Sequence, residues 1–182
     1  MTDLEICNMA LSFHDKSITQ DQLTSKSNKE AKNCALYLPI AKQRCVAEFD
    51  WSFFIKKLNI DYSDSVPGFG YDNSFKLPYG TVKVVPQDRN DYSYRVLNGR
   101  IYTDETEPEV WGINEDCVED MEHPEEFDYL VAFSLGFLLC SVLAPSDQIL
   151  PQNTLNQFTW TKKLLIEKEA MSFYRDIGTQ EE

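Results

Sequence analysis

Apolar residues recur every three or four positions near the start of the chain, which is the spacing of a helix with one buried face. Leu4, Cys7 and Leu11 form the first such stripe. Thr2 and Glu5 precede it with the T-x-x-E spacing of a capping box. The pattern therefore predicts an amphipathic helix that begins immediately after Thr2.

A longer stripe predicts a second helix, after a polar stretch at residues 15–26 that we interpret as a loop. Ser27 and Glu30 are spaced as a second capping box, and Pro39 inside the stripe predicts a kink or local break. The apolar positions of this stripe are Ala31, Cys34, Ala35, Leu38, Ala41, Cys45 and Phe49.

Between residues 61 and 120 the period of the pattern changes from about 3.6 to 2, which indicates strands. Residues 92–97 and 100–103 flank Asn98-Gly99, a dipeptide typical of the type I′ turn of a hairpin. Residues 81–85 have strand composition, and residues 109–113 predict a further strand.

The last third of the chain returns to the helical period. Residues 129–146 form an uncharged run of 18 residues, preceded by Pro124 and stopped by Pro145. Because the run has acidic flanks and no cationic anchors, we interpret it as a core helix rather than a membrane span, with Leu138 in the core. Pro151 opens a final helix, for which Gly178 is a C-terminal cap.

Together these patterns predict a mainly α protein of the α+β class. Residues 1–60 and 121–177 form a helical bundle core, interrupted by a β-rich insertion at 61–120 that contains the hairpin around Asn98-Gly99. Residues 178–182 are expected to be a flexible tail.

Charged residues are distributed unevenly along the chain. Its 182 residues include 30 acidic and 17 basic side chains, a net charge of −13, and residues 101–161 contain no Lys or Arg. This balance disfavours binding of nucleic acid by phosphate neutralisation and docking on an anionic membrane. The acidic segment either keeps the protein soluble, repels a polyanion or meets a basic partner. Its candidate surface residues are Glu115, Asp116, Glu119, Asp120 and Glu122.

No motif assigns a catalytic residue. The chain has no phosphate-binding loop, no nucleophile elbow and no H-E-x-x-H. Its five cysteines form no C-x-x-C pair and its two histidines have no ligand at metal spacing, so we expect no metal site and no cofactor. With 30 acidic residues, a pair of carboxylates at glycosidase distance would arise by chance and carries no weight.

The final helix contains more apolar residues than one stripe requires, which predicts a partner site. The expected aromatic anchors are Trp160, Phe173 and Tyr174. The alternative is that this helix simply closes the bundle.

Six segments resemble, in order, motifs of one known family. They begin with the helix at Ile6–Ser12 (I-x-N-x-A-L-S) and the second helix, where Glu30-Ala31, Cys34, Tyr37, Pro39-Ile40-Ala41 and Arg44 match. The others are Glu48–Phe53, Phe75–Pro78, Asn98–Asp104 and the apolar helix Phe127–Ala144. Over residues 4–144 the chain thus resembles the head-to-tail connectors of short-tailed bacteriophages, the tail tubular protein A or gateway type.

This resemblance implies a virion protein with no catalysis, assembled in the host cytoplasm. Its subunits would form a ring, commonly of twelve copies, that docks under the portal and extends the DNA channel to the tail or nozzle proteins. DNA would pass without specific binding, no membrane would be involved, and the final helix would grip the portal. Two alternatives remain open: a peptidoglycan-cleaving glycan hydrolase activity in the same virion protein, and an acidic interaction protein.

Overall fold

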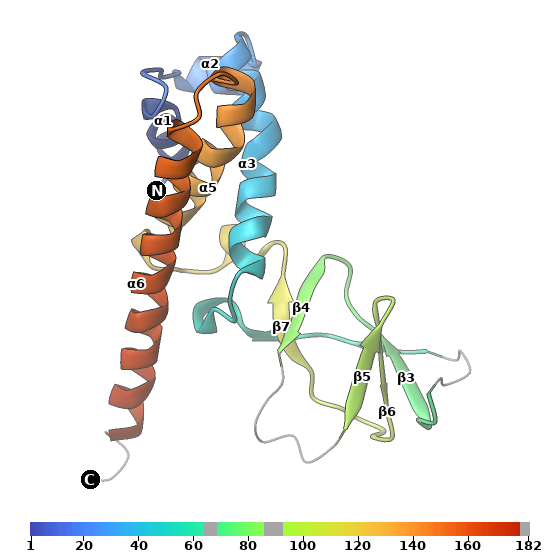
Figure 1. Cartoon of the computed structure of the whole chain (residues 1–182). Helices are drawn as coiled ribbons and strands as arrows, with labels where there is room; N and C mark the ends of the chain where they lie inside the picture. The colour runs from blue at the N-terminus through green and yellow to red at the C-terminus, as the bar shows by residue number, and fades with distance from the viewer. Residues whose placement is uncertain (64–68, 86–92, 179–182) are drawn as a thin grey trace. The chain divides into compact units, whose positions relative to one another are not determined.

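A computed structural model gives the architecture of residues 1–63, 69–85 and 93–178, with the backbone alone described for 171–178. It contains 52% helix and 16% strand, which confirms the mainly α, α+β class. The chain folds as two compact units (Figure 1). The helical unit contains Met1–Glu48 and the residues from His123 onward, and the β unit contains Phe49–Glu122.

The helical unit is built around α5 (Glu125–Leu143), which packs against three other helices. These are α1 (Asp3–Ser12), α3 (Lys29–Ala47) and α6 (Leu150–Gly178), and a short α2 (Gln20–Ser25) packs on α3. The predicted capping box at the start of α1 is confirmed. The Thr2 side chain accepts a hydrogen bond from the backbone of Glu5, whose carboxylate accepts one from the backbone N–H of Thr2 at 2.7 Å.

The start of α3 differs from the prediction. Asn28, not Ser27, is the cap residue, and its Oδ1 atom accepts the N–H of Ala31 at 2.7 Å. The helix also continues without interruption from Lys29 to Ala47, so Pro39 does not break it. Pro39 lies on the exposed face, where water can hydrate the carbonyl group that loses its intrahelical partner.

The polar stretch expected to be a loop contains α2. Thr19 and Gln22 form a reciprocal capping box, with the Gln22 side chain accepting the Thr19 N–H at 2.9 Å. This helix has no buried residue, so it has no apolar stripe by which periodicity could detect it.

The uncharged run forms the core helix, as predicted. Phe127, Leu130, Leu135 and Leu139 of α5 are fully buried. By length and composition α5 could cross a membrane, but 61% of its apolar window is buried inside the protein. The placement of Leu138 in the core was wrong: this side chain is half-buried and borders a surface cavity of about 230 Å³. The next residue, rotated by about 100° on the helix, takes the core position.

The β unit contains two small antiparallel sheets. Sheet A has the order β1 (Lys56–Lys57), β7 (Trp111–Asn114), β4 (Thr81–Val85). Sheet B has the order β2 (Asp61–Tyr62), β3 (Asn73–Lys76), β6 (Arg100–Thr103), β5 (Tyr94–Leu97). The predicted hairpin is confirmed as β5 and β6, and the positive φ angles of Asn98 (52°) and Gly99 (70°) are those that a type I′ turn requires.

The β unit begins before the expected boundary at residue 61. Residues 49–60 include the short 3₁₀ helix Ser52–Phe54 and strand β1, which pairs with β7 more than fifty positions later in the chain. Leu58 then joins a buried cluster with Leu77, Ile101 and Val110. Such long-range pairing has no signature in the local pattern, which is why residues 49–60 were assigned to the helical core. The expected flexible tail, apart from Gly178 at the end of α6, lies outside the described residues.

Candidate interaction surfaces

The five predicted acidic residues form a surface of the β unit that we call the acidic surface: Glu115, Asp116, Glu119, Asp120 and Glu122. All five are exposed. They follow β7 and run through the short helix α4 (Cys117–Asp120), with Asp116 as its N-cap residue. The backbone N–H of Glu115 donates to the carbonyl of Gly80 at 2.9 Å, which ties the start of this segment to sheet A.

The fold brings cations to the segment that lacks them in sequence. Lys56 lies 3.2 Å from Asp116 in the β unit, and Lys57 lies 2.6 Å from Glu109. In the helical unit, Lys168 pairs with Glu126. The acidic block is therefore partly neutralised, and this includes Asp116 of the acidic surface.

One acidic residue of the segment belongs to the interior. Asp128 is only 4% exposed, and its carboxylate contacts the Met1 ammonium group and His123 Nε2, the latter at 3.0 Å. Burial raises the pKa of Asp128, but the hydrogen bonds from His123 and Met1 outweigh this effect and lower it. The network has no signal in the local pattern, because Met1 and Asp128 are 127 positions apart in the chain and meet only in the folded helical unit.

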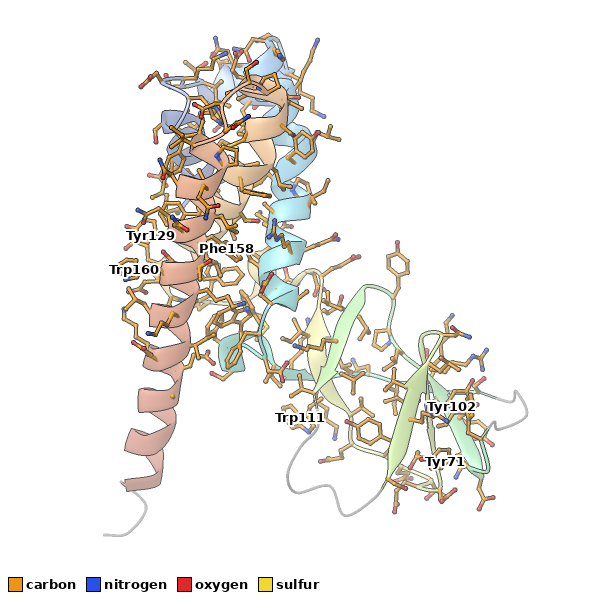
Figure 2. All side chains as sticks on the ribbon, in the orientation of Figure 1. Tyr71, Tyr102, Trp111, Tyr129, Phe158 and Trp160 are labelled. Atoms are coloured by element: carbon orange, nitrogen blue, oxygen red, sulfur yellow. The ribbon has the colours of Figure 1, made fainter. Side chains whose placement is uncertain are left out.

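The final helix has a buried face and an exposed face. Phe158 and Leu165 are buried, and the guanidinium group of Arg44 lies 5.3 Å from the centre of the Phe158 ring. Trp160 is 61% exposed and projects from α6, whereas Phe158 points towards α3 and α5 (Figure 2). The side chains of the two other expected anchors, Phe173 and Tyr174, lie outside the described part of the chain.

Helix α6 is longer than the helix on which it packs. It has 29 residues and α5 has 19, or about 43 Å and 29 Å at 1.5 Å per residue. Lys168 pairs with Glu126, the second residue of α5. The ten residues of α6 that follow Lys168 therefore continue about 15 Å past the start of α5 (Figure 1). We call residues 169–178 the α6 overhang.

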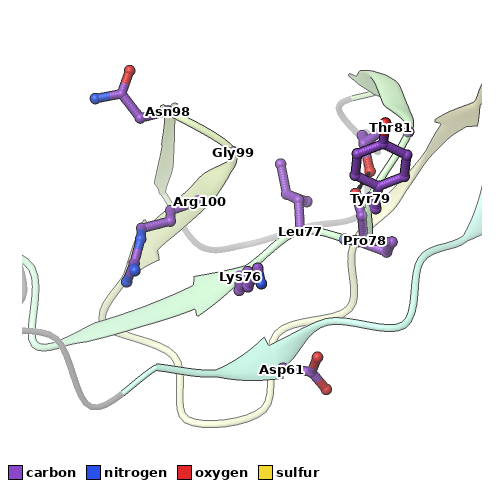
Figure 3. A pocket seen from close by; sticks show the side chains of 10 residues that line it. Asp61, Lys76, Leu77, Pro78, Tyr79, Thr81, Asn98, Gly99 and Arg100 are labelled. Carbon is purple, nitrogen blue, oxygen red and sulfur yellow. Dashed lines mark hydrogen bonds between the residues drawn. The ribbon is translucent and has the colours of Figure 1, made fainter.

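An open groove of about 520 Å³ lies in the β unit between the hairpin turn and the loop that connects β3 to β4 (Figure 3). Arg100 and Lys76 line the groove from the strands, and Tyr79, which is 95% exposed, stands at the rim. Among the described residues that line it, Asp61 is the one carboxylate. Glycoside hydrolysis by the usual mechanism requires two carboxylates, and the described residues of this lining supply one.

The cysteines behave as small apolar residues, as predicted. All five are free and buried. Burial raises the pKa of Cys45 to about 12 and that of Cys117 to about 11, so neither thiol forms the reactive thiolate near neutral pH. Among the residues that the structure describes, no three His, Cys, Asp or Glu side chains are grouped to hold a metal ion.

No model of a protein family matches the chain, and no curated protein matches it.

Proposed function

We propose that this protein is a structural subunit of a head-to-tail connector in a short-tailed bacteriophage. Its copies form a ring, of twelve subunits in the arrangement implied by the resemblance, that docks under the portal and extends the DNA channel towards the tail or nozzle proteins. The observation that carries the proposal is the α6 overhang, which continues past the helix that supports the rest of α6. The choice of this protein family rests on the six sequence motifs described above.

The overhang is suited to reach a second protein. An isolated helical segment of this length is marginal in water, and most helical stability in proteins comes from packing of an apolar face. Phe173 and Tyr174 are part of the overhang, and aromatic residues are common energetic anchors of interfaces. Several copies in a ring would engage a portal together, and this multivalency strengthens a contact that is weak for one subunit.

The acidic surface also accords with a role beside passing DNA. A channel that conducts DNA must not retain it, and exposed carboxylates repel phosphates without a specific contact. In this proposal the acidic surface faces the channel or the solvent around its mouth.

Deletion of residues 171–182 tests portal docking. The deletion keeps Lys168 and its ion pair with Glu126, so the bundle retains its described contacts. We expect a folded subunit, with nearly unchanged helix signal by circular dichroism per remaining residue, that no longer co-sediments with the cognate portal. The matched control is Lys163→Ala, a change at an exposed position of α6 before the overhang, which should leave binding intact. A folded deletion variant that still binds the portal normally would refute the docking role.

A charge substitution tests the channel. Replacing Glu119, Asp120 and Glu122 with Lys should barely affect stability, because exposed charges contribute little individually. The variant should retain DNA in a salt-sensitive manner and slow its ejection from assembled particles. Normal ejection by particles that carry this variant would assign the acidic surface to solubility instead.

A further inference from the structure

A surface cavity of about 230 Å³ opens in the helical unit where α5 ends and α6 begins. Tyr37 of α3, Leu138 of α5 and Pro151 of α6 lie in its lining. Asp147 is the one acidic or basic residue among the described residues that line it, and its Oδ1 atom already accepts the backbone N–H of Leu150 at 3.0 Å. We call this the α5–α6 cavity, and its lining suits an apolar group rather than an ion.

The volume of the α5–α6 cavity fits one large side chain. An apolar protein cavity of about 150 Å³ holds a benzene molecule, so about 230 Å³ accommodates the two fused rings of an indole. Two exposed apolar side chains adjoin the lining. Ile149 lies between two lining residues in the loop before α6, and Ile40 is one turn after Tyr37 on α3. Apolar surface therefore continues from the cavity onto its rim.

Trp160 presents an indole on the outer side of α6. It is 61% exposed, and three of its four neighbours one turn away on the helix are polar: Asn156, Gln157 and Lys163. A tryptophan side chain buries roughly 150–250 Å² when it enters a pocket, and tryptophan is among the residues most enriched as energetic anchors of interfaces. The indole therefore has apolar surface that its own helix leaves exposed and that a partner can bury.

Trp160 cannot fill the α5–α6 cavity of its own chain. It follows Pro151, a lining residue, by nine positions, which is about 14 Å along the helix axis and half a turn around it. Phe158 points towards α3 and α5, and Trp160 projects away from them (Figure 2). The chain therefore carries an indole and a cavity of matching size on different sides of α6. A contact between two such unlike surfaces is heterologous, and repeated contacts of this kind form a ring when the rotation between copies closes.

We propose that Trp160 of one copy of this chain inserts its indole into the α5–α6 cavity of a neighbouring copy. The inference rests on the ring in the proposed function and specifies how its subunits meet, while the α6 overhang remains with the portal. A stable interface buries roughly 800 Å² on each partner, so one indole with the rim residues Ile40 and Ile149 gives a weak contact between two copies. In a closed ring every copy makes this contact twice, and the multivalency strengthens it.

Sedimentation velocity of the full chain over a range of concentrations tests the contact. The wild type should form species larger than a dimer. Its association should be stronger at about 0.5 M than at about 20 mM salt, because salt screens the repulsion between copies that each carry −13 and does not weaken an apolar contact.

Two substitutions at exposed positions disrupt the two sides of the contact. Trp160→Ala removes the indole, and Ser141→Glu places a carboxylate in the lining of the cavity. Each variant alone should weaken association by roughly 30-fold, the loss expected for an energetic anchor of an interface. The matched control is Ser12→Glu. Ser12 and Ser141 are both exposed near the C-terminal end of a helix, and each hydroxyl donates to the carbonyl three residues earlier, but Ser12 does not line the cavity. The control should associate as the wild type does, and circular dichroism checks that all three variants are folded.

A mixture of the two disrupted variants provides the decisive measurement. Trp160→Ala keeps an open cavity and Ser141→Glu keeps the indole, so a mixed pair has one intact contact. The mixture should form 1:1 dimers with an affinity within about threefold of the wild-type contact, since distant substitutions act independently. It should form no larger species, because the remaining surfaces of the mixed dimer are both disrupted.

Three results would overturn the inference: a wild-type chain that stays monomeric, a disrupted variant that associates normally, or a mixture that does not form 1:1 dimers. Loss of portal binding in Ser141→Glu with unchanged self-association would assign the cavity to the portal and overturn it too. A chain that binds the portal but fails these tests leaves the proposed function standing. A chain that passes them but does not bind the portal refutes portal docking alone.

Discussion

Replacement of Leu139 by Ala should destabilise the helical unit, whereas the same replacement at Leu138 should have little effect. Leu139 is fully buried in α5, and Leu138 is half-buried beside a surface cavity. The two substitutions remove the same atoms from adjacent positions of one helix, so helix propensity and the unfolded chain change equally. Their difference therefore measures burial.

The expected magnitudes follow from that burial. Leu→Ala in a packed core costs about 2–5 kcal/mol, since the transfer free energy of the lost atoms and the free energy of the new cavity add. We expect about 3 kcal/mol for Leu139→Ala, and about 1 kcal/mol for Leu138→Ala, where water already reaches the side chain. For a chain of this size the difference of about 2 kcal/mol corresponds to a Tm lower by about 4–8 °C.

Urea unfolding followed by circular dichroism at the helix band gives both free energies of unfolding, and most of that signal arises in the helical unit. Thermal scans of the same variants provide an independent check. Equal losses at the two positions, or a larger loss at Leu138, would refute the packing of α5 described above. They would restore the core position that the sequence pattern had assigned to Leu138.

Three further predictions concern single side chains. A Cβ at Gly112 would lie 2.3 Å from the Lys83 carbonyl oxygen, so Gly112→Ala should separate β4 from β7. Amide hydrogen exchange in these two strands should then become faster, and exchange that stays slow would contradict this. Asp128→Asn should cost about 3 kcal/mol in urea, because it breaks a buried ion pair. Because the pKa of Asp128 is lowered in the folded protein, the wild type has this stabilisation above about pH 4 and loses it below. The effect of Asp128→Asn is therefore measured at pH 7, where a variant as stable as the wild type would refute the network. Burial lowers the pKa of His14, so the unfolded chain takes up a proton at a higher pH than the folded protein, and the free energy of unfolding should fall as the pH drops below about 6.5. His14→Phe should flatten the dependence of the free energy of unfolding on pH between about pH 7 and 5. An unchanged slope of that dependence would contradict this.

The sequence by itself determined the elements whose causes are local. The capping box at Thr2 acts over three residues, and the Asn98-Gly99 turn needs only the positive φ angles that these two residues tolerate. The length and apolarity of α5 likewise predicted a core helix without knowledge of its partners. These elements could be predicted from the sequence because the patterns that specify them are local.

The tertiary structure decided what depends on residues far apart in the chain. Pairing of β1 with β7 moved residues 49–60 into the β unit, and packing within the helical unit selected Leu139 over Leu138. The ion pair between Lys168 and Glu126 shows where α6 passes the start of α5.

The same holds for the candidate surfaces. The acidic surface was visible in sequence as a run of carboxylates. The cations that pair with Asp116, Glu109 and Glu126 come from other parts of the chain, as Lys56, Lys57 and Lys168. The open groove of the β unit had no signal at all, because Lys76 and Arg100 belong to strands that are paired only in the folded sheet. Local spacing encodes helices, caps and turns, whereas a surface assembled across strands exists only once long-range packing has fixed their register.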